Sequence, residues 1–287
     1  MSVCEARPMV LRVSAYVVFV FACLIGLQMQ PAFSDDLEAA RAAFVAGDFL
    51  TAARLAHEED SADAYALAAR AELAQGDFLA AAKDRRALFV DAEADARRVV
   101  ALAPDEAAGH LYLALALGFK GRIDGNIAAH FSGMAHDARS HIDRALALEP
   151  DNAWGHALDG GWNLEIVRGG GLLGETLYGA SFDKGIAAYR RALELEPQNT
   201  AIAYQFALQL LGAKATAYRD EAYRVLVQAL KPKEETAVEH LARRRAQRLK
   251  LALDTHDALA LKMILREGLG TGAGVTEPQP ALSPGKH

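Results

Sequence analysis

The segment Ile186-Ala-Ala-Tyr-Arg-Arg-Ala-Leu-Glu-Leu-Glu-Pro197-Gln-Asn-Thr-Ala-Ile-Ala-Tyr204 decides the fold of this chain. An amphipathic stretch with helical spacing ends at a proline, and a second amphipathic stretch begins directly after it. The run Arg144-Ala-Leu-Ala-Leu-Glu-Pro150 has the same form, and Pro104 and Pro232 close two further runs of this type. The recurrence indicates a copied helix–turn–helix unit, because a single unit of this kind cannot bury its own apolar face.

The repeated second helices share one packing pattern, a large apolar residue three positions before a small one. The pairs are Ile142 and Ala145, Tyr189 and Ala192, and Leu226 and Ala229. The small residue allows close helix approach and the large one fills the gap beside it. This pattern resembles the second helix of a tetratricopeptide repeat (TPR). The resemblance implies an all-α protein, a right-handed α-α superhelix (a TPR-like solenoid) of about four to five helix pairs.

Two weaker units precede the clear ones. Gly47-Asp48-Phe49 and Gly76-Asp77-Phe78 resemble the Gly-x-aromatic turn between paired TPR helices, and Ala52 and Ala81 follow at the close-packing position. We therefore expect degenerate TPR-like helices over residues 35–93 and the main array over residues 94–232.

The main array has a longer period than the family. Its prolines stand about 46, 47 and 35 residues apart, against about 34 in TPR proteins. The surplus predicts inserts near 121–135 and 168–180, and inserts of this kind usually form loops that bind partners. The second insert carries an apolar tip whose candidate contact residues are Leu172, Leu173, Leu177 and Tyr178. The alternative is a loop that folds back over its own repeat.

Residues 1–34 have the features of a cleaved secretory signal. A short basic region precedes an apolar core from Val13 to Leu27, and small residues stand before Asp35. Both cysteines, Cys4 and Cys23, lie inside this segment, so the mature chain would contain none. We expect a periplasmic or secreted protein. An uncleaved membrane anchor is the lesser alternative, and a lipoprotein cleaved before Cys23 is the least favoured.

The C-terminal part follows the last repeat proline. Residues 233–267 are expected to form capping helices, with the basic run Arg243-Arg244-Arg245 on a solvated face. Contact of this face with an acidic partner or anionic lipid is the alternative. Residues 268–287 repeat Gly and Pro without periodicity, which predicts a disordered tail.

From the sequence we expect no cofactor site, no metal site and no enzymatic activity. Gly169-Gly-Gly-Leu-Leu-Gly174 formally matches a dinucleotide-binding fingerprint but follows a helix instead of a strand. Several histidines, among them His136 and His141, fall in one stretch without the spacing of a ligand pair on one helix face. The net charge of −6 argues against nucleic-acid binding.

The concave face is the best candidate site. In TPR domains the first helix of each pair lines an inner groove, and the resemblance carries its ligand-facing positions onto mainly apolar residues. They are Leu111, Leu115, Phe119, Trp154, Gly161, Leu164, Glu165, Tyr204 and Leu208, with Asp63 and Arg70 from a weaker unit. Their character predicts a hydrophobic ligand. The competing interpretation is that these residues are core.

These observations favour an exported TPR scaffold that mediates protein–protein interaction in the cell envelope. The alternative is a periplasmic binding protein for a small apolar or lipid ligand held in the groove. The partner, an unidentified envelope protein or peptide, and the oligomeric state remain open from the sequence. An enzyme is the third and weakest hypothesis, because no catalytic motif supports it.

Overall fold

The computed structural model describes residues 35–125, 133–213, 218–232 and 236–269. These residues form helices and no strand. In chain order they are α2 (Asp35–Ala46), α3 (Phe49–Ala56), α4 (Ala62–Ala74), a wider π-helical turn η1 (Gln75–Leu79), α5 (Ala82–Leu102), α6 (Ala107–Asp124), α8 (Met134–Leu148), α9 (Ala153–Tyr178), α10 (Phe182–Leu195), α11 (Thr200–Gly212), α12 (Arg219–Ala229), α13 (Ala237–Asp254) and α14 (Ala258–Leu269). The predicted signal segment lies outside the described residues.

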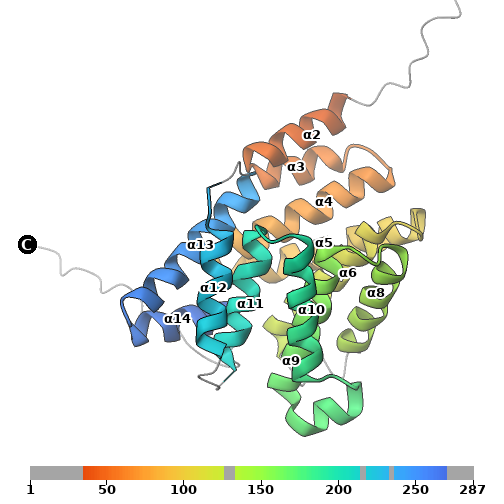
Figure 1. The fold of residues 1–287 in the computed structure, drawn as a ribbon. Helices are drawn as coiled ribbons and strands as arrows, with labels where there is room; N and C mark the ends of the chain where they lie inside the picture. The colour runs from red at the N-terminus through yellow and green to blue at the C-terminus, as the bar shows by residue number, and fades with distance from the viewer. Residues whose placement is uncertain (1–34, 126–132, 214–217, 233–235, 270–287) are drawn as a thin grey trace, which may run out of the picture.

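Consecutive helices pack as hairpins, and the hairpins stack side by side into a superhelix (Figure 1). The pairs are α2 with α3, α4 with α5, α6 with α8, α9 with α10, and α11 with α12. The predicted all-α superhelix of four to five helix pairs is therefore confirmed.

The sequence between hairpins both ends one helix and starts the next. After Pro150, the side chain of Asn152 accepts a hydrogen bond from the Gly155 amide (2.9 Å). After Pro197, Asn199 accepts one from the Ile202 amide (3.0 Å). Proline stops the preceding helix, and asparagine satisfies an amide that the new first turn would leave unpaired.

The predicted close-packing pattern is present in the main array. Ala145, Ala192 and Ala229 are fully buried, and the large apolar residue three positions before each of them is buried as well. Close approach extends to the partner helix, since a methyl group added at Gly160 would lie 2.5 Å from the Tyr189 ring. The hairpins are thus held at distances that only small residues permit.

The early repeats depart from the pattern at one turn. Gly47 has φ +84° and Asp48 caps α3, so the first predicted turn is correct. The second is wrong, because Gly76-Asp77-Phe78 continues α4 as η1 instead of turning the chain. As a result Ala81 is exposed just before α5, and Ala92 and Ala96 of α5 take the buried positions.

The insert at 168–180 is helical. Helix α9 continues through it to Tyr178 with a break at Gly171, whose φ of 51° and ψ of −143° are accessible to glycine and costly for other residues. The expected loop is therefore a helical extension with a kink. Of the insert near 121–135, Gly121–Asp124 form the last turn of α6, and residues 126–132 lie outside the described residues.

The C-terminal helices do more than cap the array. Helix α13 runs from the α2–α3 hairpin to α14 and packs against α11 (Figure 1). At its start Ala237, Val238 and Leu241 pack on the first hairpin's core. The last helices thus return to the first ones and close the superhelix. Gly268 and Leu269, placed in the tail by the sequence, belong to α14, and residues 270–287 are not described.

Candidate ligand-binding groove

A cavity of about 550 Å³ lies on the concave side of the superhelix. Its walls come mainly from α4, α6, α9 and α11, which are the first helices of their pairs, and α13 contributes Val238, Ala242 and Arg245. We call this cavity the groove. One face of α13 therefore forms a further wall of the groove, in addition to the helices of the array.

The structure brings together most of the groove residues that the sequence indicated. Those that line it are Leu111, Leu115, Phe119, Trp154, Gly161, Glu165 and Tyr204, with Arg70 from the weaker unit. Leu164 and Leu208 do not line it. Leu164 packs against Gly185 of α10 and Leu208 against Gly268 of α14, so both belong to the core between helices. Asp63 lies at the surface, 3.4 Å from Arg41.

The groove wall is apolar and partly accessible. Trp154, at the start of α9, is 38% exposed. Phe119 is buried and stacks on Phe89 with ring centroids 4.7 Å apart. An apolar wall with an accessible indole can bind a hydrophobic ligand without first unfolding part of the core.

Sequence reasoning missed four wall residues of α9, namely Ala157, Leu158, Trp162 and Ile166. The Trp162 indole donates a hydrogen bond to the Ala135 carbonyl (2.8 Å). Leu158 and Trp162 lie on the helical stripe that begins at Trp154, at the fourth and eighth positions after it. The helical period of about 3.6 residues is therefore enough to predict these two positions from the sequence.

A polar network crosses the groove at Glu165. Its carboxylate accepts hydrogen bonds from Arg122 (3.3 Å), Gln209 (2.9 Å) and Arg168. Burial lowers the pKa of Arg122, and burial together with the Arg122 charge lowers the pKa of Arg168 to about 10. The Nε of Arg122 is buried without a hydrogen-bond partner among the described residues. The three hydrogen bonds to Glu165 nevertheless pair its carboxylate with groups of the protein.

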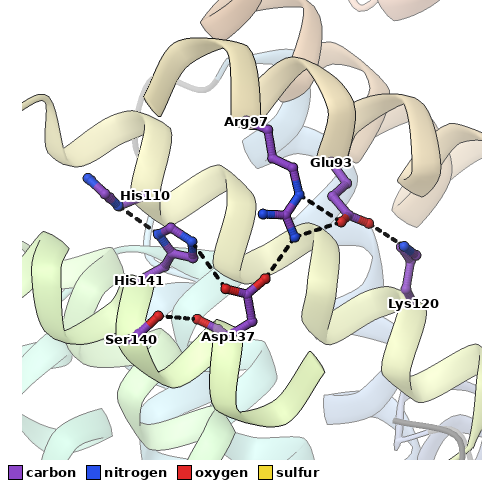
Figure 2. Close-up of polar contacts among 7 residues, drawn as sticks. All are labelled: Glu93, Arg97, His110, Lys120, Asp137, Ser140 and His141. Carbon is purple, nitrogen blue, oxygen red and sulfur yellow. Dashed lines mark hydrogen bonds and ion pairs between the residues drawn. The ribbon is translucent and has the colours of Figure 1, made fainter. Parts of the chain in front are cut away.

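The histidine-rich stretch forms a polar chain between helices (Figure 2). Nδ1 of His110 on α6 lies 2.7 Å from Nδ1 of His141 on α8, and His141 also contacts Asp137. Asp137 accepts a hydrogen bond from Arg97 of α5 (2.7 Å). Burial lowers the pKa of His141. The pair comes from two helices, so no spacing within one helix could have indicated it.

The helical extension of α9 presents apolar side chains to solvent. Leu172 and Leu173 are 79% and 76% exposed, and Leu177 is also exposed. Tyr178 instead packs edge-on against Trp162, with ring centroids 6.0 Å apart. Because Trp162 lines the groove, the end of the extension lies beside the groove wall.

The stacked helix pairs and the concave groove define a TPR-like α-α superhelix. A thermophilic TPR protein from Thermus thermophilus has a similar fold, with a TM-score of 0.53 and 20% sequence identity over 74% of this chain and 97% of that chain. The profile of the "Regulator of microtubule dynamics protein 1-3" family matches residues 34–254, and the chain belongs to this family. The search of curated proteins found no match.

Proposed function

We propose that this protein is an interaction scaffold whose groove binds an apolar segment of another protein. One observation carries the proposal: equivalent helices of successive repeats place apolar side chains along one cavity of about 550 Å³, with Trp154 accessible at its wall. A cavity of this size and character is typical of binding sites. The exposed Leu172 and Leu173 on the neighbouring extension would add contact area for a macromolecular partner.

The family is named after proteins described as regulators of microtubule dynamics, and that role is a property of those proteins. For this chain we propose the general part of such a role, which is binding of another protein. We propose binding without catalysis, because the Glu165 carboxylate at the groove wall is already hydrogen-bonded to Arg122 and Gln209.

The wall that α13 adds to the groove favours a second candidate, a small apolar or lipid ligand. A partly enclosed apolar cavity shields a small ligand from water on most sides. The guanidinium group of Arg70 at its wall would suit a ligand with a polar or acidic end, whereas Arg122 and Arg245 are paired with Glu165 and Asp77.

We also propose that the scaffold is exported and works in the cell envelope, with cleavage after Ser34. The short apolar core and the small residues before Asp35 support this location. N-terminal sequencing of the secreted form tests it, and a chain that still begins at Met1 or begins at Cys23 would contradict it. None of the helices that the structure describes combines the length and the apolar character needed to cross a membrane.

Fluorescence of the chain's two tryptophans tests the groove proposal. In a Trp162→Phe variant only Trp154 reports, and acrylamide should quench it in the free protein. A bound partner or ligand should protect it. The matched Trp154→Phe variant, which retains Trp162, should show less quenching, because that indole is partly buried and hydrogen-bonded. A Trp154 signal that resists quenching in the free protein would contradict the proposal.

Native mass spectrometry of the purified protein then separates the two candidates. An apolar molecule of defined mass, released by Leu115→Glu, supports the small-ligand function. A chain without such a molecule, whose Trp154 becomes protected only by a protein partner, supports the scaffold.

A further inference from the structure

Three polar side chains from successive helical elements meet in the N-terminal half, outside the groove. His57 follows α3, Glu72 lies on α4 and Asp95 on α5. One potential ligand atom from each lies within 4.8 Å of the other two. Nε2 of His57 is 2.7 Å from Oδ2 of Asp95. We call these residues the His57–Glu72–Asp95 cluster.

The two carboxylates of the cluster are buried between α4 and α5. Glu72 is flanked by the buried Ala71 and Leu73, and Asp95 by the buried Ala96. Glu72 is only 6% exposed and Asp95 8%. Burying two carboxylates side by side is costly unless positive charge or further hydrogen bonds compensate them.

The protein groups leave this compensation incomplete. The imidazole of His57 forms a hydrogen bond with Asp95. Oε2 of Glu72, in contrast, is buried and has no hydrogen-bond partner among the described residues. The Asp95 carboxylate, whose ligand atom lies within 4.8 Å of that of Glu72, adds a second negative charge instead of compensating the first. An unpaired carboxylate oxygen next to a second carboxylate and an imidazole needs a cation or a proton.

We propose that His57, Glu72 and Asp95 bind a divalent transition-metal ion of the zinc class. One imidazole and two carboxylates form a mixed nitrogen and oxygen ligand set, which suits zinc and its neighbours better than calcium or magnesium. Tetrahedral bonds of about 2.0–2.1 Å place ligand atoms about 3.3 Å apart, so small side-chain movements would close the site. The His57 side chain is 42% exposed, which leaves an entry path and room for a water as fourth ligand.

The site would join α3, α4 and α5, the part of the array in which the repeat pattern is weakest. A metal ion there would stabilise the folded state upon binding, because its ligands come from three helical elements. The groove is separate, because none of the three ligands lines it.

Titration of the full chain with ZnCl2, after removal of metal by a chelator, tests the proposal. Calorimetry should give one tight site, and Zn²⁺ should raise the melting temperature. Glu72→Gln, which keeps the shape of the side chain, should weaken that site at least about tenfold. Asp137→Asn is the matched control, since Asp137 also contacts a histidine, and it should leave the tight site unchanged.

Cobalt(II) provides a readout on the unaltered protein if a variant fails to fold. Bound Co²⁺ should show the visible absorption of a four-coordinate site, and Zn²⁺ should displace it. Wild-type affinity for Zn²⁺ in Glu72→Gln, or a wild-type protein without a tight site, would overturn the proposal. In that case the two carboxylates share a proton, and Glu72→Gln should match or exceed the metal-free wild type in melting temperature.

Discussion

Nη1 of Arg245 on α13 donates to both carboxylate oxygens of Asp77, at 3.0 Å each, across 168 residues of sequence. Its Nη2 donates to the Asp77 carbonyl oxygen, and its guanidinium lies 4.3 Å from the centre of the Phe78 ring. This pair joins the connection between α4 and α5, the two helices of the second hairpin, to the helix that lines the groove from the C-terminal side of the chain. The π-helical turn η1 that replaced the predicted loop is the segment that presents Asp77.

Breaking this pair should destabilise the closed superhelix. In Asp77→Asn the guanidinium loses its charged partner in a site that is only about one-fifth exposed. We expect a loss of about 1–3 kcal/mol in the free energy of unfolding, measured by urea denaturation. Glu267→Gln is the control, because its pair with Arg248 is about half exposed. That change should cost less than about 1 kcal/mol. Equal losses in the two variants would show that the Asp77 pair does not hold α13.

Enlarging a close-packing alanine should strain the array. Ala145→Leu or Ala192→Leu would insert atoms where both residues are fully buried, at a cost of about 1–3 kcal/mol. Ala147→Leu on the same helix α8 is the matched control, since Ala147 is exposed and should tolerate the change. Chemical denaturation of the three variants measures the difference. Wild-type stability in Ala145→Leu would mean that α8 does not approach its partner helix as closely as the structure places it.

Adjacent glycines of α9 should respond in opposite directions to alanine. Gly171→Ala should cost about 1–3 kcal/mol locally, because its φ of 51° and ψ of −143° are strained for any residue with a Cβ. Gly170→Ala should stabilise the helix by about 0.5–1 kcal/mol, because no atom would obstruct the added methyl group. Hydrogen exchange of the amides between Gly170 and Tyr178 reports both effects. Similar protection in the two variants would argue against the kink.

The Glu93 ion pair should make stability depend on pH. Burial by itself would raise the pKa of Glu93, but hydrogen bonds from Lys120 and Arg97 outweigh it and hold the pKa below the ordinary value of 4.5 (Figure 2). A carboxyl with a lowered folded-state pKa stabilises the protein above its unfolded-state pKa. That stabilisation is lost as pH falls through the lower, folded-state value.

The stability difference between wild type and Glu93→Gln should therefore be largest at neutral pH and shrink below about pH 4.5. Urea denaturation across this range measures it. Glu194→Gln is the control, because Glu194 forms an exposed pair with Arg191 and should change stability little at any pH. A Glu93→Gln difference that stays constant down to pH 3 would contradict the assigned ion pair.

The sequence by itself determined the features that depend on local spacing. Pro150 and Pro197 with the following asparagines mark where hairpins begin, and Ala145 and Ala192 mark where helices touch. These signals lie within a few residues of one another, so the helix period is enough to interpret them. The resemblance to TPR repeats indicated Leu115, Phe119 and Trp154 as groove positions, and all three line the groove in the structure.

Only the tertiary structure decided the features that join distant segments. The period could not separate Leu164 and Leu208 from their groove neighbours, because the helices packed behind them determine which flank of a helix becomes core. The meeting of His57, Glu72 and Asp95 depends on how the neighbouring helices α3, α4 and α5 stack. The return of α13 to the first hairpins and the pairing of Arg245 with Asp77 depend on the curvature of the whole superhelix. The curvature results from small rotations between successive repeats that add up along the array. A short stretch of sequence therefore does not determine it.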